Sequence, residues 1–183
     1  MSIISRMILN IIGFKITGKI PYEIKKNVMV VVPHTSNWDF PLGLLVRSAI
    51  RYKISYVAKH TLFKPGIGWF FKALGGIPVN RTRSTNSVKV MANLFEETDK
   101  LAIVIAPEGT RKKVDTLKKG FYYISKQAGV PIIPIKFDYK NREINFGEPF
   151  YHTDDEQADL EYFDEYFKGV QGKVAENSYG YGK

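Results

Sequence analysis

Short apolar segments rich in β-branched and aromatic residues recur along this chain, separated by stretches with helical periodicity. Val28–Val32 is the most apolar of them, with no polar residue to face water. Strands have such continuous apolar sequences when they belong to a parallel sheet that is covered on both faces. The alternation therefore predicts an α/β fold, a single domain with a mainly parallel central sheet flanked by helices. The expected strands are Val28–Val32, Tyr52–Ala58, Gly76–Val79, Leu101–Ala106, Pro131–Phe137 and Glu143–Phe146.

The stretches between these strands carry helical patterns. We expect helices at Pro41–Ile50, Gly68–Leu74, Ser84–Thr98, Lys119–Ala128 and Asp154–Val170. Repeats, low-complexity tracts and long linkers do not interrupt the sequence, so residues 20–172 are expected to form one domain. Residues 1–19 are expected to add a short amphipathic helix, and residues 173–183 a flexible tail.

The amino end carries a stripe of large apolar residues at helical spacing. Its members are Ile3, Ile4, Met7, Ile8, Ile11 and Ile12. The run is shorter than the roughly 20 apolar residues that a bilayer requires, and no cleavage site of small residues follows it. Two alternatives remain, a helix on a membrane surface or a helix packed on the domain; we favour the first. A cytoplasmic protein, peripheral on the inner face of the cell membrane, is expected.

The positive charge is concentrated in one part of the chain. The net charge is +9, and residues 1–83 contain 13 Lys and Arg but two acidic residues, Glu23 and Asp39. Such a distribution favours a polyanionic partner, either an anionic membrane surface or nucleic acid. The aromatic residues cluster in apolar runs instead of alternating with cations, which argues against nucleic acid.

The numbers of cysteine and histidine residues limit the kinds of bond and site that the chain can form. The chain has no cysteine and three separated histidines. Disulfides, thiolate metal sites and a cysteine nucleophile are excluded, and we expect no metal site and no cofactor.

The loop after the first expected strand holds the leading candidate for catalysis. It reads PHTSNWDF and places His34 five positions before Asp39. Five residues separate side chains by roughly 16 Å in a strand and by about 140° around a helix, so neither element brings the pair together. Pro33, Ser36 and Asn37 are typical of turns, and a turn lets the two side chains meet.

A histidine held by an aspartate is the base half of a catalytic triad, because the carboxylate fixes the tautomer and stabilises the imidazolium. The chain has no cysteine and no G-x-S-x-G motif, so we expect His34 to deprotonate a substrate hydroxyl and not a protein serine. The alternative is structural: Asp39 caps the helix expected near Pro41, and His34 bonds to the backbone.

Three further stretches carry candidate functions. APEGTRKK, residues 106–113, follows an expected strand; Gly109 permits close approach of a ligand, and the four residues after it offer a hydroxyl and three cations for phosphate. Glu108 could orient a hydroxyl or pair with an arginine. Residues 58–81 are apolar and aromatic, which favours core, a tunnel or a second membrane-facing surface. VPIIPI, residues 130–135, carries two prolines, which is typical of an edge or bulged strand that lines a groove.

Together these stretches resemble the glycerophospholipid acyltransferase family, whose type members are 1-acyl-glycerol-3-phosphate acyltransferases. The family's H-x-x-x-x-D block is similar to residues 34–39, and its arginine-ended second block to residues 76–81. Its P-E-G-T-R block resembles residues 107–111, and its V-P-I-x-P-V block resembles residues 130–135. The order and spacing of the four blocks agree as well.

The resemblance implies an O-acyltransferase of phospholipid biosynthesis. It would move a fatty acyl group from acyl-CoA or acyl carrier protein to a lysophospholipid hydroxyl, by default that of 1-acyl-glycerol-3-phosphate, giving phosphatidic acid. His34 would be the general base and Asp39 its orienting partner. The residues implied in substrate binding are Lys59, Arg81, Glu108, Gly109, Thr110 and Arg111.

The sequence departs from the family pattern at Asn80, Ala106 and Lys112, where many members have acidic, aromatic and serine residues. The acceptor therefore stays open between lysophosphatidic acid, another lysolipid and an amino-acid lipid. Three other readings of the chain also stay open: a lipid-binding relative without turnover, a thioesterase that uses water, and a basic nucleic-acid-binding protein.

Overall fold

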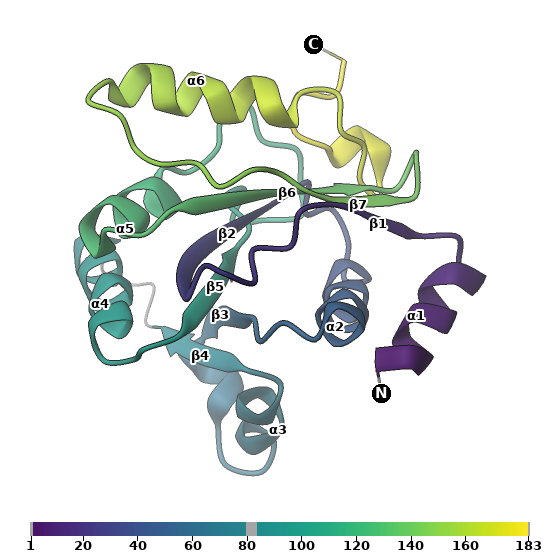
Figure 1. Cartoon of the computed structure of the whole chain (residues 1–183), viewed down its shortest axis with the longest axis horizontal. Helices are drawn as coiled ribbons and strands as arrows, with labels where there is room; N and C mark the ends of the chain where they lie inside the picture. Colours follow the sequence, from purple (N-terminus) through teal and green to yellow (C-terminus); the bar gives the residue numbers. More distant parts are fainter. Residues whose placement is uncertain (1, 80–83, 183) are drawn as a thin grey trace.

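A seven-stranded sheet organises the chain (Figure 1). The computed structural model describes residues 2–79 and 84–182. The strands are β1 Lys15–Gly18, β2 Lys26–Val32, β3 Ser55–Lys59, β4 Gly76–Val79, β5 Leu101–Ile105, β6 Ile132–Asp138 and β7 Glu143–Phe146. The helices are α1 Ser2–Ile11, α2 Asp39–Ile50, η1 His60–Phe63, α3 Gly68–Ala73, α4 Ser84–Glu96, α5 Gly120–Ala128, α6 Glu156–Phe167 and η2 Ala175–Asn177.

The strand order is β1-β7-β6-β2-β5-β3-β4, and all neighbours are parallel except β6 and β7. The apolar strand β2 lies in the middle, where β5 and β6 pair with it on either side. The expectation of an edge strand at residues 130–135 is wrong, because β6 pairs with both β2 and β7. This confirms the predicted α/β fold with a mainly parallel sheet and helices on both faces (Figure 1).

Successive residues of β2 point to opposite faces, as the pleat of a strand requires. Val28, Val30 and Val32 pack into a core covered by α4, α5 and α6. Met29 and Val31 pack into a second core, which α1 and α2 cover. Both layers of helices thus hold β2 rigidly, and with it the loop that follows.

The strand β1 was not predicted. Its sequence, KITG, contains lysine, threonine and glycine and lacks the apolar run that marks the central strands. It lies at the end of the sheet and pairs in parallel with β7, where Lys15 faces Glu143. An edge strand has one neighbour, so its sequence needs less apolar character.

The amino-terminal helix α1 packs on the domain through the face opposite the apolar stripe. Leu9 is buried against α2, the Ser5 and Ser48 hydroxyls are 2.8 Å apart, and Arg6 Nε donates to the carbonyl of Ala49 at 3.0 Å. The six stripe residues point outward and are between 37% and 81% exposed. The helix packs on the domain, as the second alternative expected, but through the face without the stripe; contact of the exposed stripe with a membrane stays a prediction.

Among the helices of the described residues, none combines the length and apolarity needed to cross a bilayer.

The carboxyl-terminal segment, for which flexibility was expected, packs against the domain. Ser178 and Tyr179 are buried, and the Tyr179 hydroxyl donates to Asp164 at 2.7 Å. The backbone N–H of Val174 donates to the Thr35 hydroxyl at 3.1 Å. This last contact connects the tail to the loop that follows β2.

Candidate active site

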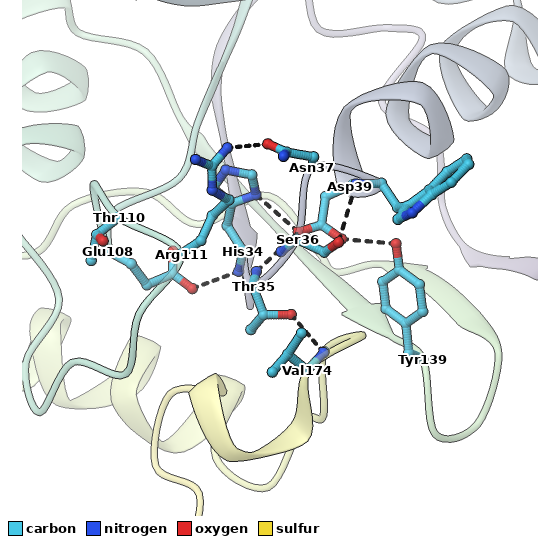
Figure 2. Close-up of polar contacts among 12 residues, drawn as sticks. His34, Thr35, Ser36, Asn37, Asp39, Glu108, Thr110, Arg111, Tyr139 and Val174 are labelled. Atoms are coloured by element: carbon cyan, nitrogen blue, oxygen red, sulfur yellow. Dashed lines mark hydrogen bonds and ion pairs between the residues drawn. The ribbon is translucent and has the colours of Figure 1, made fainter.

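The loops after β2 and β5 lie side by side, because the two strands are parallel neighbours and end at the same edge of the sheet. Figure 2 shows the contact that joins them: Oε1 of Glu108 accepts a hydrogen bond from the backbone N–H of His34 at 2.8 Å. The two motifs expected at the carboxyl ends of strands thus meet at one place.

The side chains of His34 and Asp39 meet within the first of these loops. Nδ1 of His34 lies 2.9 Å from Oδ2 of Asp39, and the same oxygen accepts the backbone N–H groups of Thr35 and Ser36, each at 2.9 Å (Figure 2). Asp39 begins α2, but the N-cap residue is Trp38, which makes no capping hydrogen bond through its side chain. The carboxylate therefore serves the loop and the imidazole and does not cap the helix.

The other oxygen of Asp39 binds a residue that the motifs did not reveal. The hydroxyl of Tyr139 donates to Oδ1 at 2.8 Å (Figure 2). Burial and this hydrogen bond raise the pKa of Tyr139 far above its usual value, so the phenol keeps its proton. Tyr139 directly follows β6, which neighbours β2. The rule that functional loops follow the carboxyl ends of strands would have pointed to it.

Four donors thus hold the buried Asp39 carboxylate in one orientation. With Nδ1 of His34 bonded to that carboxylate, Nε2 is the ring nitrogen left to take a proton. The His34 side chain is partly exposed, whereas that of Asp39 is buried. This arrangement can accept a proton from a bound molecule and stabilise the charged ring from behind.

Glu108 lies behind the loop and does not line the cleft beside it. It is 3% exposed, and among the described residues its Oε2 has no hydrogen-bond partner. Burial raises the pKa of Glu108, against the opposing effect of the hydrogen bond from the His34 N–H. Its carboxylate accepts the hydrogen bond from the His34 backbone, so we interpret Glu108 as a residue that supports the loop.

A cleft of about 760 Å³ opens beside His34 and Asp39. Gly109, Thr110 and Arg111 line its polar end, and an Arg111 guanidinium N–H donates to the side-chain oxygen of Asn37 (Figure 2). Gly109 has a φ of 64°, a conformation that favours glycine. The apolar walls come from α2 and the strands, and include Leu44, Val46, Ile54, Val57, Val104 and Ile135.

Two predicted substrate contacts cannot be placed in the cleft. Lys59 is the last residue of β3, but its side chain is outside the described part of the chain, and Arg81 lies wholly outside it. Both remain predictions. Within the described residues, no group of three or more His, Asp or Glu side chains gathers closely enough to hold a metal ion.

The family model for acyltransferases matches residues 13–138, which include β2, the His34 loop and the loop after β5. The chain belongs to the acyltransferase family. This match covers most of the sheet and all the described residues at the polar end of the cleft.

Two curated relatives of this family member are 1-acyl-sn-glycerol-3-phosphate acyltransferases. The beta protein of Homo sapiens is 33% identical over 129 residues, which are 67% of this chain and 45% of the relative. The Haemophilus influenzae protein is 29% identical over 142 residues, 73% of this chain and 58% of the relative. The chain spans about half the length of these relatives.

A solved structure shares the fold. The crystal structure of the 1-acyl-sn-glycerophosphate (LPA) acyltransferase PlsC from Thermotoga maritima superimposes with a TM-score of 0.61 at 21% identity. The superposition covers 90% of this chain and 74% of that one.

Proposed function

We propose that this protein transfers a fatty acyl group from an acyl-CoA or acyl carrier protein thioester to the hydroxyl of a lysophospholipid, with His34 as the general base. The observation that carries the proposal is the contact of His34 Nδ1 with the buried Asp39 carboxylate, beside a cleft that Thr110, Arg111 and many apolar side chains line. Membership of the acyltransferase family and relatives named 1-acyl-sn-glycerol-3-phosphate acyltransferase support it.

The chemical step uses few protein groups. Nε2 of His34 removes the proton of the acceptor hydroxyl as its oxygen attacks the thioester carbonyl carbon, and Asp39 stabilises the imidazolium. The resulting tetrahedral intermediate expels the thiolate, which takes the proton from His34 and leaves as the free thiol. A new oxygen ester replaces the thioester, and the histidine returns to its neutral state.

The ends of the cleft suggest how an amphipathic lipid is held. Arg111 and Thr110 offer a guanidinium and a hydroxyl beside His34, which suits a phosphate group. Lys59 and Arg81 are proposed to add cations at the same edge. The apolar walls suit a fatty acyl chain. By default the acceptor is 1-acyl-glycerol-3-phosphate, with another lysolipid or an amino-acid lipid as the alternative.

The exposed stripe of α1 suits a membrane surface. Its six apolar side chains point away from the domain, and Lys15 and Lys19 follow the helix in sequence. Apolar side chains and nearby lysines both favour an anionic leaflet. We place the protein on the inner face of the cell membrane, where acyl-CoA and acyl carrier protein are available from the cytoplasm.

A thiol-release screen tests the proposal. Acyl-CoA and acyl carrier protein donors are each combined with lysophosphatidic acid, other lysophospholipids and an amino-acid lipid, and thiol and acylated lipid are both measured. The proposal predicts thiol release that depends on an acceptor, with one acylated lipid per thiol. Thiol release without an acceptor would instead indicate a thioesterase, and lipid binding without thiol release a binding protein.

A further inference from the structure

We propose that the segment from η1 to α3, residues 60–74, is a second membrane-contact surface that inserts apolar side chains into an anionic leaflet. This inference rests on the proposed acyl transfer to a membrane lipid and adds a docking element separate from α1. Figure 1 shows α3 at the bottom of the molecule beyond β4, while α1 lies beside α2.

The segment presents four large apolar side chains to solvent within nine residues. Trp69 is 70% exposed, Ile67 59%, Phe70 49% and Leu62 41%. Scattered exposed apolar residues are ordinary on protein surfaces, but a cluster of this density marks an interaction site.

The segment also has an inner side, distinct from this outer group. Phe63 and Phe71 form its inner side, where their ring centroids are 6.2 Å apart. The N–H of Gly68 donates to the carbonyl of Lys64 at 2.9 Å, and a Cβ on Gly68 would approach the Phe63 carbonyl to 2.5 Å. The segment is therefore closed by its backbone and inner rings, and the outer side chains are free to contact something else.

The charge around the segment identifies the occupant as an anionic leaflet. Residues 40–95 contain nine Lys and Arg and no Asp or Glu. Two of these cations, Lys64 and Lys72, lie in the segment and are exposed. Tryptophan beside lysine is the combination that prefers the boundary between headgroups and acyl chains. An acidic soluble protein would pair with the cations, but its charge alone would not account for the four apolar side chains that point outward.

The segment is also joined to the wall of the cleft. The Tyr56 hydroxyl donates to the carbonyl of Phe71 at 3.2 Å, and the Tyr56 ring contacts Phe40 of α2 with centroids 5.0 Å apart. Tyr56 and Phe40 both line the cleft, and Arg47 of α2 donates to the carbonyl of Leu74. Insertion of this segment would bring the leaflet next to the cleft, where a lipid acceptor has to arrive.

Fluorescence tests insertion directly, because the chain has two tryptophans. The Trp38→Phe variant reports on Trp69 alone. Added to phosphatidylglycerol vesicles, Trp69 should shift its emission to shorter wavelength, and brominated acyl chains should quench it. Unshifted and unquenched emission from protein that co-sediments with the vesicles would overturn the proposal, because docking would then use α1 alone.

Paired variants measure the contribution of the segment. The double variant Trp69→Ser with Phe70→Ser should lower vesicle partitioning about tenfold or more. The control, Val90→Ser with Tyr151→Ser, removes two exposed apolar side chains elsewhere on the surface and should leave partitioning unchanged. Equal partitioning of both double variants, or loss of carrier-protein binding in place of vesicle binding, would overturn the inference.

Activity assays on soluble and on vesicle-bound acceptors distinguish a failure of this inference from a failure of the proposed function. On a short-chain lysolipid that dissolves as monomers, the Trp69→Ser, Phe70→Ser variant should keep its kcat/KM, and on acceptor in vesicles it should lose about tenfold. If Trp69 is quenched but no acceptor is acylated, the surface stands and the proposed function fails. If soluble and vesicle substrates are affected equally, the segment acts in catalysis and the docking role fails.

Discussion

Two histidine–aspartate pairs lie in the described part of the chain, and they differ in what surrounds them. His34 and Asp39 lie at the edge of the sheet and open on a cleft, with Nδ1 and Oδ2 2.9 Å apart. The ring of His152 packs edge-on against that of Tyr122, and Nδ1 of His152 lies 4.0 Å from Oδ2 of Asp159. Nε2 of His152 is 2.8 Å from the hydroxyl of Ser125, so the second group even has the residue types of a hydrolase triad.

We interpret the second group as structural, because its hydroxyl and carboxylate are buried and none of its residues lines the cleft beside His34. Ser125 is fully buried, and its hydroxyl donates to the Val130 carbonyl. Asp159 accepts hydrogen bonds from the Tyr122 hydroxyl and from Thr153. Burial together with the bond to Asp159 raises the pKa of Tyr122 to about 12. Burial also lowers the pKa of His152, so the neutral ring is favoured. Residue types alone therefore do not identify a site; access from a cleft does.

Removing the imidazole of the exposed pair should have the largest effect. His34→Ala should lower kcat/KM for thiol release by about 10²–10⁴-fold, the usual contribution of a general base. Its thermal unfolding midpoint should stay near that of the native protein. His152→Ala is the matched control and should do the reverse, losing stability but keeping activity per folded molecule. Similar activity losses in the two variants would erase the distinction between the pairs.

Removing the carboxylate of the buried pair should chiefly affect stability. Asp159→Ala leaves the buried Tyr122 hydroxyl without its acceptor and also removes the acceptor of the partly buried Thr153 N–H. We expect the free energy of unfolding to fall by about 2–4 kcal/mol. Urea denaturation measures this directly. A loss below 0.5 kcal/mol, on the scale of an ordinary surface substitution, would mean that the network is not structural.

Tyr139 is a positioning residue for the pair of His34 and Asp39, and the buried pair has no such link to a reaction. Tyr139→Phe should lower kcat by about two- to tenfold with a smaller change in KM, since one hydrogen bond to the Asp39 carboxylate is lost. The unfolding midpoint should change little, because the aromatic ring is kept. An unchanged kcat together with a lower unfolding midpoint would reduce Tyr139 to a packing role.

Glu108→Gln should have the smallest effect, visible as a pH trend in stability. Burial raises the pKa of Glu108 in the folded protein. When the pH lies between the pKa of the unfolded state and that of the folded state, the folded state therefore binds more protons than the unfolded state. The native protein should therefore lose stability as the pH rises from about 4.5 through the raised folded pKa. Glutamine does not titrate. The thermal unfolding midpoint of the variant should therefore rise relative to that of the native protein as the pH increases over this range. A constant difference between the two midpoints would contradict the burial argument.

The sequence was most informative for strands, whose pattern is contained in a few consecutive residues. Gly76–Val79 and Glu143–Phe146 match β4 and β7 to the residue, and the central strand was found because burial on both faces leaves a continuous apolar run. The strand expected at Tyr52–Ala58 begins at Ser55, and α2 begins at Asp39 and not at Pro41. The start of α2 differs because the Asp39 backbone is helical while its side chain belongs to the loop.

The rest of the site depends on contacts between distant parts of the chain, which periodicity does not record. Tyr139 lies 100 residues after Asp39, and Val174 lies 139 residues after Thr35. The helix α1 shows the same limit. Its apolar stripe predicted a buried or membrane-bound face, but the side that packs on the domain is the one with Ser5 and Leu9. Only the position of α2 decides which face is covered.

The central claim is that His34 acts on a bound lipid hydroxyl, without a covalent acyl-protein. Rapid mixing of the native protein with an acyl thioester, before and after adding the lysolipid identified by the screen, tests it most directly. We predict no burst of thiol and no gain in protein mass with donor alone, then one thiol per acylated lipid once acceptor is present. A burst of one thiol per protein, with the protein heavier by one acyl group, would contradict the account.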